Sequence, residues 1–338
     1  MRRGAAGLLL LCLVLCGVTA RAETIRLATF NTELSRRGPG LLLRDLGRKD
    51  DQIDAVLATI VEAQADILLL QGIDWDYEGR TLAAVQNRLA DLGLDYSDGF
   101  TSRPNAGMPS GLDLDGDGRL GEPEDAWGWG RFTGAAGMIL LSRFPIDRAE
   151  LRDLTGFLWR DLPDHRMPIR KDGTPYPDPE TAKLLRLPSI NHWMVPIRLN
   201  TGAILNVLAF HAAPPVFDGP EDRNGRRNAD EILLWLHLLE GSLGPAPKPP
   251  FAILGDANND PNRGEGHKDA ITRLLRDPRL QAPEPKDVEG QSHTALWPQT
   301  GPMRVDYILP SADLKITASG LLRSEGGRHG LVWVDISR

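Results

Sequence analysis

The sequence is poor in cysteine. Its 338 residues include two cysteines, Cys12 and Cys16, and none follows them. Both lie in a segment with a short basic start, an apolar run over residues 7–18 and a small-x-small cleavage site. We therefore expect residues 1–22 to be a signal peptide. The mature chain would then have no disulfides, although we expect it to be exported to the periplasm or the extracellular medium.

The sequence also lacks a long hydrophobic run. A spanning helix needs about 20 apolar residues, and the run at residues 7–18 is shorter. We therefore expect no membrane span. The composition, 41% hydrophobic and 25% charged, is that of a globular protein. No linker divides the chain clearly, so we expect a single domain over residues 23–338, with an insertion at about residues 97–135.

Positive charge is scarce as well. Lysine and arginine number 39 against 46 acids, a net charge of −7. Loss of residues 1–22 removes three arginines and no acids, so the net charge becomes −7 − 3 = −10. Proteins that bind nucleic acid tightly and non-specifically neutralise phosphates with a basic stripe, and none is present here. Nucleic acid is therefore a partner that we do not favour, although metal ions can screen the charge.

Apolar runs alternate with amphipathic segments in the first part of the mature chain. Residues 24–31 and 65–71 are predicted strands, and residues 51–61 and 81–92 are predicted helices. This strand–helix–strand–helix order is typical of an α/β sandwich. Residues 36–50 are predicted to be a loop. Further strands are predicted at residues 137–146, 192–197, 203–210, 251–254, 303–310 and 331–336.

Two segments between these strands are polar. Residues 152–186 are rich in proline and are predicted to form a long surface excursion. Residues 221–231 are highly charged and lead into a predicted helix that continues through Leu239. Their charges either face a site or cap the helix, and capping is the interpretation that we prefer.

Polar residues stand where several predicted strands end. Asp256 and Asn258 follow the apolar residues 251–254, and side chains two apart on a strand point the same way. A carboxylate beside an amide suits a hard cation or a phosphate-bound water. An isolated polar residue at a strand end is usually a turn former, but the whole set predicts one site along a sheet edge. The other members are Asn31, Asp74, Asp76, His211, Asp306 and His329.

Residues 113–124 have the spacing of a twelve-residue calcium loop. The acids at positions 1, 3, 5 and 12 are Asp113, Asp115, Asp117 and Glu124. Position 6 is Gly118, and position 7, where such loops bind the ion through a backbone carbonyl, is Arg119. The alternative is a solvated acidic turn. No convincing helices flank the loop, so we expect a structural Ca²⁺ that orders the insertion rather than a switch.

Several motifs of this chain are those of a known family. On them, the chain resembles the endonuclease/exonuclease/phosphatase superfamily, which has the DNase I-like fold, from about Thr24 to Ile336. The resemblance implies a four-layer α/β sandwich of two mixed β-sheets flanked by helices. It also implies hydrolysis of a phosphoester with a divalent cation, Mg²⁺ or Mn²⁺. The motifs lie at residues 29–31, 66–71, 142–146, 255–258, 304–309 and 328–329.

The resemblance also implies a role for most of the polar strand ends. His329 would be the general base on the attacking water, with Asp306 orienting its imidazole. Asp256 and Asn258 would organise the water and the leaving group, and Asp256 would also contribute to the metal site. His211 would contact a phosphate oxygen of the substrate, as would Asn258.

The metal side departs from the family pattern. The resemblance implies that Asn31 and a glutamate after the second strand hold the ion, with an aspartate before the last histidine. This chain has Gly72 and Arg328 at those two positions. Glycine has no side-chain oxygen and arginine repels a cation. We expect Asp74 or Asp76 to replace the glutamate, and Arg328 to bind a substrate phosphate bidentately.

Two functions follow from these features. The first is an exported, metal-dependent phosphoesterase that acts on a phosphomonoester or phosphodiester rather than on duplex DNA, as a monomer. The second is a non-catalytic, calcium-stabilised binding protein with a degenerate metal site. We favour the enzyme, because the other five site positions implied by the resemblance are all present.

Overall fold

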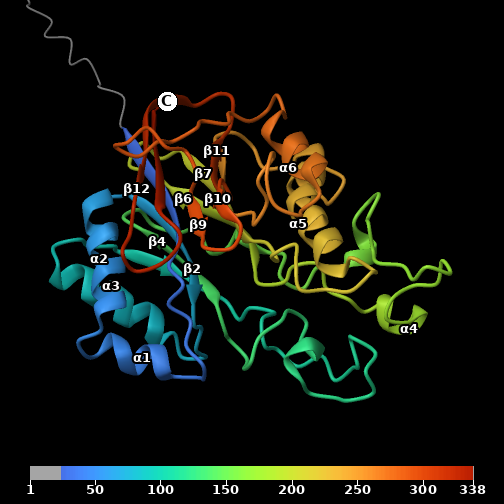
Figure 1. Ribbon diagram of the computed structural model, residues 1–338. Helices are drawn as coiled ribbons and strands as arrows, with labels where there is room; N and C mark the ends of the chain where they lie inside the picture. Colours follow the sequence, from blue (N-terminus) through green and yellow to red (C-terminus); the bar gives the residue numbers. More distant parts are fainter. Residues whose placement is uncertain (1–23, 338) are drawn as a thin grey trace, which may run out of the picture.

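The structure, a computed structural model, describes residues 24–337. The expected signal peptide lies outside these residues. The strands form a six-stranded sheet in the order β12-β13-β1-β2-β4-β3, a five-stranded sheet in the order β11-β8-β7-β6-β5, and a two-stranded pair, β10-β9 (Figure 1). The strands are β1 (Ile25–Asn31), β2 (Ile67–Ile73), β3 (Asp98–Phe100), β4 (Gly137–Ser142), β5 (Arg152–Asp153), β6 (His192–Arg198), β7 (Ile204–His211), β8 (Phe251–Asp256), β9 (Ala295–Trp297), β10 (Gly301–Met303), β11 (Asp306–Pro310), β12 (Lys315–Leu322) and β13 (Leu331–Ser337).

The two large sheets pack face to face, and helices cover their outer faces. Leu27 and Leu69 of one sheet and Val207 and Leu254 of the other lie fully buried in one apolar cluster between the sheets. Helices α2 and α3 pack on the six-stranded sheet, and α5 and α6 pack on the five-stranded sheet (Figure 1). The predicted four-layer α/β sandwich is confirmed. The helices are α1 (Leu41–Leu46), α2 (Asp51–Ala63), α3 (Arg80–Asp91), α4 (Pro179–Ala182), α5 (Arg223–Glu240) and α6 (Lys268–Leu275), with 3₁₀ turns η1 (Pro123–Asp125) and η2 (Trp159–Asp161).

Helix α2 shows how local sequence produces an element. Asp50 caps it, because its carboxylate accepts a hydrogen bond from the backbone N–H of Ile53 at 3.0 Å. The predicted loop before it is partly wrong, since residues 41–46 form α1. Leu42 and Leu46, four residues apart, are buried there, and this spacing places both on one helical face.

The proline-rich segment is not simply a surface excursion. Trp159 is fully buried against α5, and its indole N–H donates to Asp230 at 2.6 Å. The charges at the start of α5 are not helix caps either, because Asp222 makes no capping bond with its side chain. Asp230 and Glu231 are fully buried and accept backbone N–H groups from other segments.

The insertion at residues 97–135 packs on this same region. The buried amide of Asn105 donates to the carbonyls of Thr155 and Pro188, at 2.6 and 2.7 Å. A Cβ on Gly128 would lie 1.8 Å from the carbonyl oxygen of Ser189, so a side chain there would block the contact. Among residues 24–337, no helix has the length and apolar content needed to cross a membrane.

The strand register brings predicted polar residues together. Strands β7 and β8 run parallel, with His211 opposite Asp256, and their carboxyl ends meet at one edge of the sheet. Strand β11 runs antiparallel to β8, so its first residue, Asp306, also pairs with Asp256. Three polar residues from separate stretches of sequence therefore lie side by side.

Candidate active site

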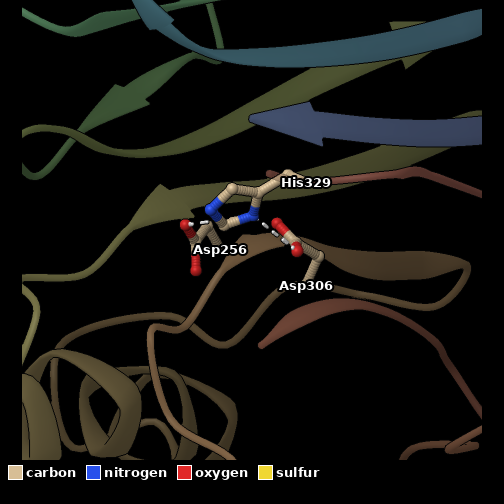
Figure 2. Close-up of side chains that lie close together, drawn as sticks. All are labelled: Asp256, Asp306 and His329. Carbon is tan, nitrogen blue, oxygen red and sulfur yellow. Dashed lines mark hydrogen bonds and ion pairs between the residues drawn. The ribbon is translucent and has the colours of Figure 1, made fainter. Parts of the chain in front are cut away.

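The centre of the site is a buried Asp306–His329 pair (Figure 2). Nδ1 of His329 lies 2.9 Å from Oδ2 of Asp306. The backbone N–H of Asp306 donates to the hydroxyl of Thr294, and the backbone of His329 pairs with Ala295 in β9. Because Nδ1 is engaged by the carboxylate, Nε2 is the nitrogen left to exchange a proton with a bound molecule.

Asp256 is the second carboxylate of the site. Figure 2 shows the Asp256 and Asp306 carboxylates beside the imidazole of His329. Oδ2 of Asp256 accepts a hydrogen bond from the Asn31 amide at 2.9 Å and lies 3.6 Å from Nε2 of His211. It is also 4.0 Å from Nδ1 of His329. Asp256 is fully buried, so it connects the end of β1 to the end of β7 without contact with solvent.

A glycine makes this close packing possible. A Cβ on Gly255 would lie 2.0 Å from the carbonyl oxygen of Phe210 on the neighbouring strand. Gly255 therefore allows β8 to lie against β7 immediately before Asp256.

The environments of the two histidines differ strongly. Burial opposes protonation of His329, but the charge and hydrogen bond of Asp306, helped by Asp256, outweigh it and raise its pKa to about 9. Burial, together with repulsion from His329, lowers the pKa of His211 to about 3. Burial and repulsion from Asp306 raise the pKa of Asp256. At neutral pH, His211 is therefore a neutral imidazole beside a strongly basic one.

Asn258 lies at the edge of the site. It has φ of 48°, and its backbone N–H donates to Oδ1 of Asp256 at 2.7 Å. Its side-chain amide donates to the carbonyl of Ala212, the residue after His211. Among residues 24–337, no hydrogen bond to the Asn258 side-chain oxygen is found, while the amide N–H holds the two strand ends together.

The clustered side chains fit a divalent cation on the Asp256 side. Ligand atoms of Asp256, Asp306 and His329 all lie within 4.8 Å of one another. Oδ1 of Asp306 is buried and has no hydrogen-bond partner within the described part of the chain. Two carboxylates with an unsatisfied oxygen form a donor set that a hard cation would satisfy.

Asp74 and Asp76 are not part of this cluster. The carboxylate of Asp74 accepts hydrogen bonds from the Ser35 hydroxyl at 2.5 Å and from the backbone N–H groups of Arg36 and Ala136. The carboxylate of Asp76 accepts from backbone N–H groups at the start of α3. The structure therefore does not support the expectation that one of these acids replaces the missing glutamate, because Asp74 holds two loop segments and Asp76 binds the start of α3.

A functional candidate that the sequence did not single out is Glu33. Its carboxylate pairs with Arg328, the residue before His329. The sequence signal for it is slight. Glu33 stands two residues after Asn31, as Asn258 stands two after Asp256, and both residues follow a strand end with positive φ, 51° and 48°.

Three of the four acids expected to bind Ca²⁺ lie together. Carboxylate oxygens of Asp113, Asp115 and Asp117 lie within 4.8 Å of one another. Glu124 is not in that group, and its carboxylate accepts a hydrogen bond from the indole of Trp129 at 3.0 Å. The side chain of Arg119 points to Glu122.

The chain belongs to the endonuclease/exonuclease/phosphatase family, whose model matches residues 28–337. Members of this family are generally hydrolases that act on phosphoester bonds. No curated protein matches the chain.

Solved structures agree with this fold. An endonuclease/exonuclease/phosphatase from Beutenbergia cavernae superposes with a TM-score of 0.55 and 14% identity, over 94% of this chain and 72% of that one. A family protein from Bacteroides thetaiotaomicron has a TM-score of 0.54 and 12% identity, over 94% and 98% of the two chains. The human Nocturnin catalytic domain has a TM-score of 0.50 and 17% identity, over 93% and 94%. At these identities the likeness shows the fold alone.

Proposed function

We propose that this protein is a phosphoesterase in which His329 activates the attacking water. The observation that carries the proposal is the buried Asp306–His329 pair, 2.9 Å apart, beside Asp256. A carboxylate that holds Nδ1 fixes the tautomer and stabilises the imidazolium that forms when Nε2 takes a proton. The raised pKa of His329, about 9, makes its unprotonated form a stronger base than a free imidazole, and the fraction of His329 in that form increases as the pH rises toward 9.

The neighbouring residues have complementary tasks. A neutral His211 can donate an N–H to a phosphoryl oxygen, and its low pKa keeps it neutral at working pH. Asn258, which is bonded to Asp256 and to Ala212, could orient the water or the leaving group with its side-chain oxygen. These contacts place water and phosphorus close together, which is a large part of the rate gain in phosphoryl transfer.

Metal dependence is part of the proposal. Asp256 and Asp306 would hold a divalent cation, Mg²⁺ or Mn²⁺. When bound, such an ion supplies positive charge to the phosphoryl oxygens and the leaving group.

The substrate is a phosphomonoester or phosphodiester rather than duplex DNA. The net charge of −7 and the absence of a basic stripe in the sequence support this choice. We also propose that the protein is exported after loss of residues 1–22 and acts as a monomer. Fractionation of cells that express the full chain tests the export, and light scattering on the mature protein tests the monomer.

Turnover assays test the proposed activity. The mature protein is assayed with bis(p-nitrophenyl) phosphate, p-nitrophenyl phosphate and plasmid DNA, with EDTA, Mg²⁺ or Mn²⁺. We expect metal-stimulated hydrolysis of a small ester that His329→Ala reduces by at least about 100-fold. His165→Ala, which removes an exposed histidine of the proline-rich segment, is the control and should retain full activity. Hydrolysis that persists in His329→Ala would contradict the proposal, and no hydrolysis by the wild type would favour the binding protein.

We further propose that the loop at residues 113–124 binds a structural Ca²⁺. The convergence of three carboxylates supports this. The ion would stabilise the insertion, since a ligand that binds only the folded state raises stability.

A further inference from the structure

The segment after β1 takes the space that a side chain at position 72 would need. Gly72 has φ of 71°, and a Cβ there would lie 2.8 Å from Oδ1 of Asn31 and 2.9 Å from the backbone nitrogen of Glu33. The backbone N–H of Thr32 donates to the carbonyl of Gln71 at 3.0 Å and holds the segment in place. The glycine therefore allows Glu33 to lie beside Asn31.

Glu33 holds Arg328 at several points. Oε2 of Glu33 accepts a hydrogen bond from the backbone N–H of Arg328 at 2.6 Å. Oε1 accepts hydrogen bonds from two side-chain nitrogens of Arg328, Nε at 2.7 Å and Nη2. Gly327 is needed for this approach, because a Cβ there would lie 2.7 Å from Oε2 of Glu33. Both oxygens of Glu33 are thus engaged by one arginine, and neither is left as a metal ligand.

The pair lies next to the catalytic centre. The carbonyl of Arg328 accepts a hydrogen bond from the backbone N–H of Leu296 in β9. The backbones of Arg328 and His329 are therefore both bound to β9. The Arg328 side chain is 52% exposed, and Nη1 has no hydrogen-bond partner among the described residues. A guanidinium with an N–H group that is unpaired among the described residues is therefore exposed at the position that precedes His329 in the chain.

No free carboxylate is provided at the three positions on this side of the site. Gly72 has no side chain, and the Glu33 carboxylate is bound to Arg328. The oxygens that remain are those of neutral amides: Oδ1 of Asn31, which accepts the Glu33 N–H at 3.3 Å, and Oε1 of Gln71, which is buried and unpaired within residues 24–337. The positive charge on this side is the guanidinium itself. It is permanently charged, and its planar N–H groups match phosphate oxygens.

We propose that Arg328, fixed in place by Glu33, binds a phosphoryl oxygen of the substrate and supplies the positive charge on the Asn31 side of the site. Arg328 is the residue that touches the substrate, and Glu33 is a positioning residue that acts through it. This inference rests on the proposed function of the same site. Its consequence is that inorganic phosphate binds to the protein without a divalent cation.

Phosphate titration of the metal-free protein tests the binding role. The mature protein is stripped with EDTA, and inorganic phosphate is titrated by calorimetry. We expect measurable binding that Arg328→Gln weakens by at least about tenfold. Arg148→Gln is the matched control, since Arg148 forms a two-point pair with Asp98 and its side chain is 55% exposed. The inference is overturned if the metal-free wild type does not bind phosphate, or if Arg328→Gln binds it equally well.

A separate measurement tests Glu33. The Nε–Hε signal of Arg328 is identified by NMR as the one lost in Arg328→Gln, and its exchange with water is measured. We expect Glu33→Ala to speed this exchange at least about tenfold, because the bond to Nε is lost, and to leave the Arg148 signal unchanged. An unchanged Arg328 rate would show that Glu33 does not position it.

The outcomes separate this inference from the proposed activity. Phosphate binding that depends on Arg328, in a protein without turnover, would support the anion site and contradict the hydrolase. Turnover that depends on His329, with phosphate binding that Arg328→Gln does not weaken, would support the hydrolase and contradict the anion site.

Discussion

At the scale of single residues, Gly72 determines the shape of the metal side of the site. Its missing side chain lets the segment after β1 approach, and this places Glu33 against Arg328. The sequence shows the glycine and the arginine, but their connection through Glu33 depends on contacts across 295 positions. No local pattern encodes such a contact, so Glu33 could not be predicted.

Replacement of Gly72 tests this view. Gly72→Ala should reduce the free energy of unfolding by about 2–4 kcal/mol, from the unfavourable φ and from overlap with Asn31 and Glu33. Gly79→Ala is the control, because Gly79 has φ of 69° but a Cβ there would meet nothing within 4 Å. It should cost about 1 kcal/mol. Equal losses in the two variants, measured by urea unfolding, would contradict the steric argument.

At the scale of elements, α5 links the outer segments to the catalytic edge. The buried carboxylate of Glu231 accepts the N–H and hydroxyl of Ser189 and the N–H of Ala213, two residues after His211. The sequence predicts the helix correctly from its apolar spacing. It does not reveal that charges near its start are buried, because their partners lie in segments that pack there only in the folded chain.

Glu231 makes stability depend on pH. Burial, opposed by Arg227, raises its pKa to about 7, above the ordinary value of 4.5. Between these values the folded state holds a proton that the unfolded state has released. The free energy of unfolding should therefore fall as pH rises through this window, by on the order of 3 kcal/mol from this group.

Urea unfolding of wild type and Glu231→Gln at pH 5 and pH 8 measures the effect. Both oxygens of Glu231 accept backbone N–H groups, and the variant replaces one of them with an NH2 group that cannot accept, so the variant should be less stable overall. The difference in free energy of unfolding between wild type and variant should nevertheless be smaller at pH 8 than at pH 5. Only the wild type has a carboxyl group at this position that ionises and so loses stability. A difference that is independent of pH would contradict the account.

At the scale of the whole molecule, the order of apolar and amphipathic segments predicts an α/β sandwich, and the family resemblance implies its four layers, but neither predicts how the insertion and the proline-rich segment attach. Strands β1, β2, β4, β6, β7, β8, β11 and β13 follow from apolar runs, and the polar residues at their ends mark the site. Strand β12 is half exposed and lacks such a run, so no sequence pattern indicated it. The insertion and the proline-rich segment fold on each other through Asn105, which composition does not reveal.

Calcium binding at residues 113–124 should affect the stability of the whole molecule. Millimolar Ca²⁺ should raise the melting temperature of the EDTA-treated protein by several degrees, since the ion binds only the folded loop. Asp115→Asn should abolish the shift. Asp172→Asn, which changes an exposed turn acid outside the loop, should retain it. A shift that survives Asp115→Asn would place the stabilising ion elsewhere.

The most direct test of the catalytic account is a double-mutant cycle on the Asp306–His329 pair. The value of kcat/KM for a small phosphoester is compared among wild type, Asp306→Asn, His329→Ala and the double variant. With Mg²⁺ saturating, so that weaker metal binding at position 306 is compensated, the remaining effect of Asp306 acts through His329, and the double variant should be little slower than His329→Ala alone. Losses that multiply, or full activity in His329→Ala, would contradict the account.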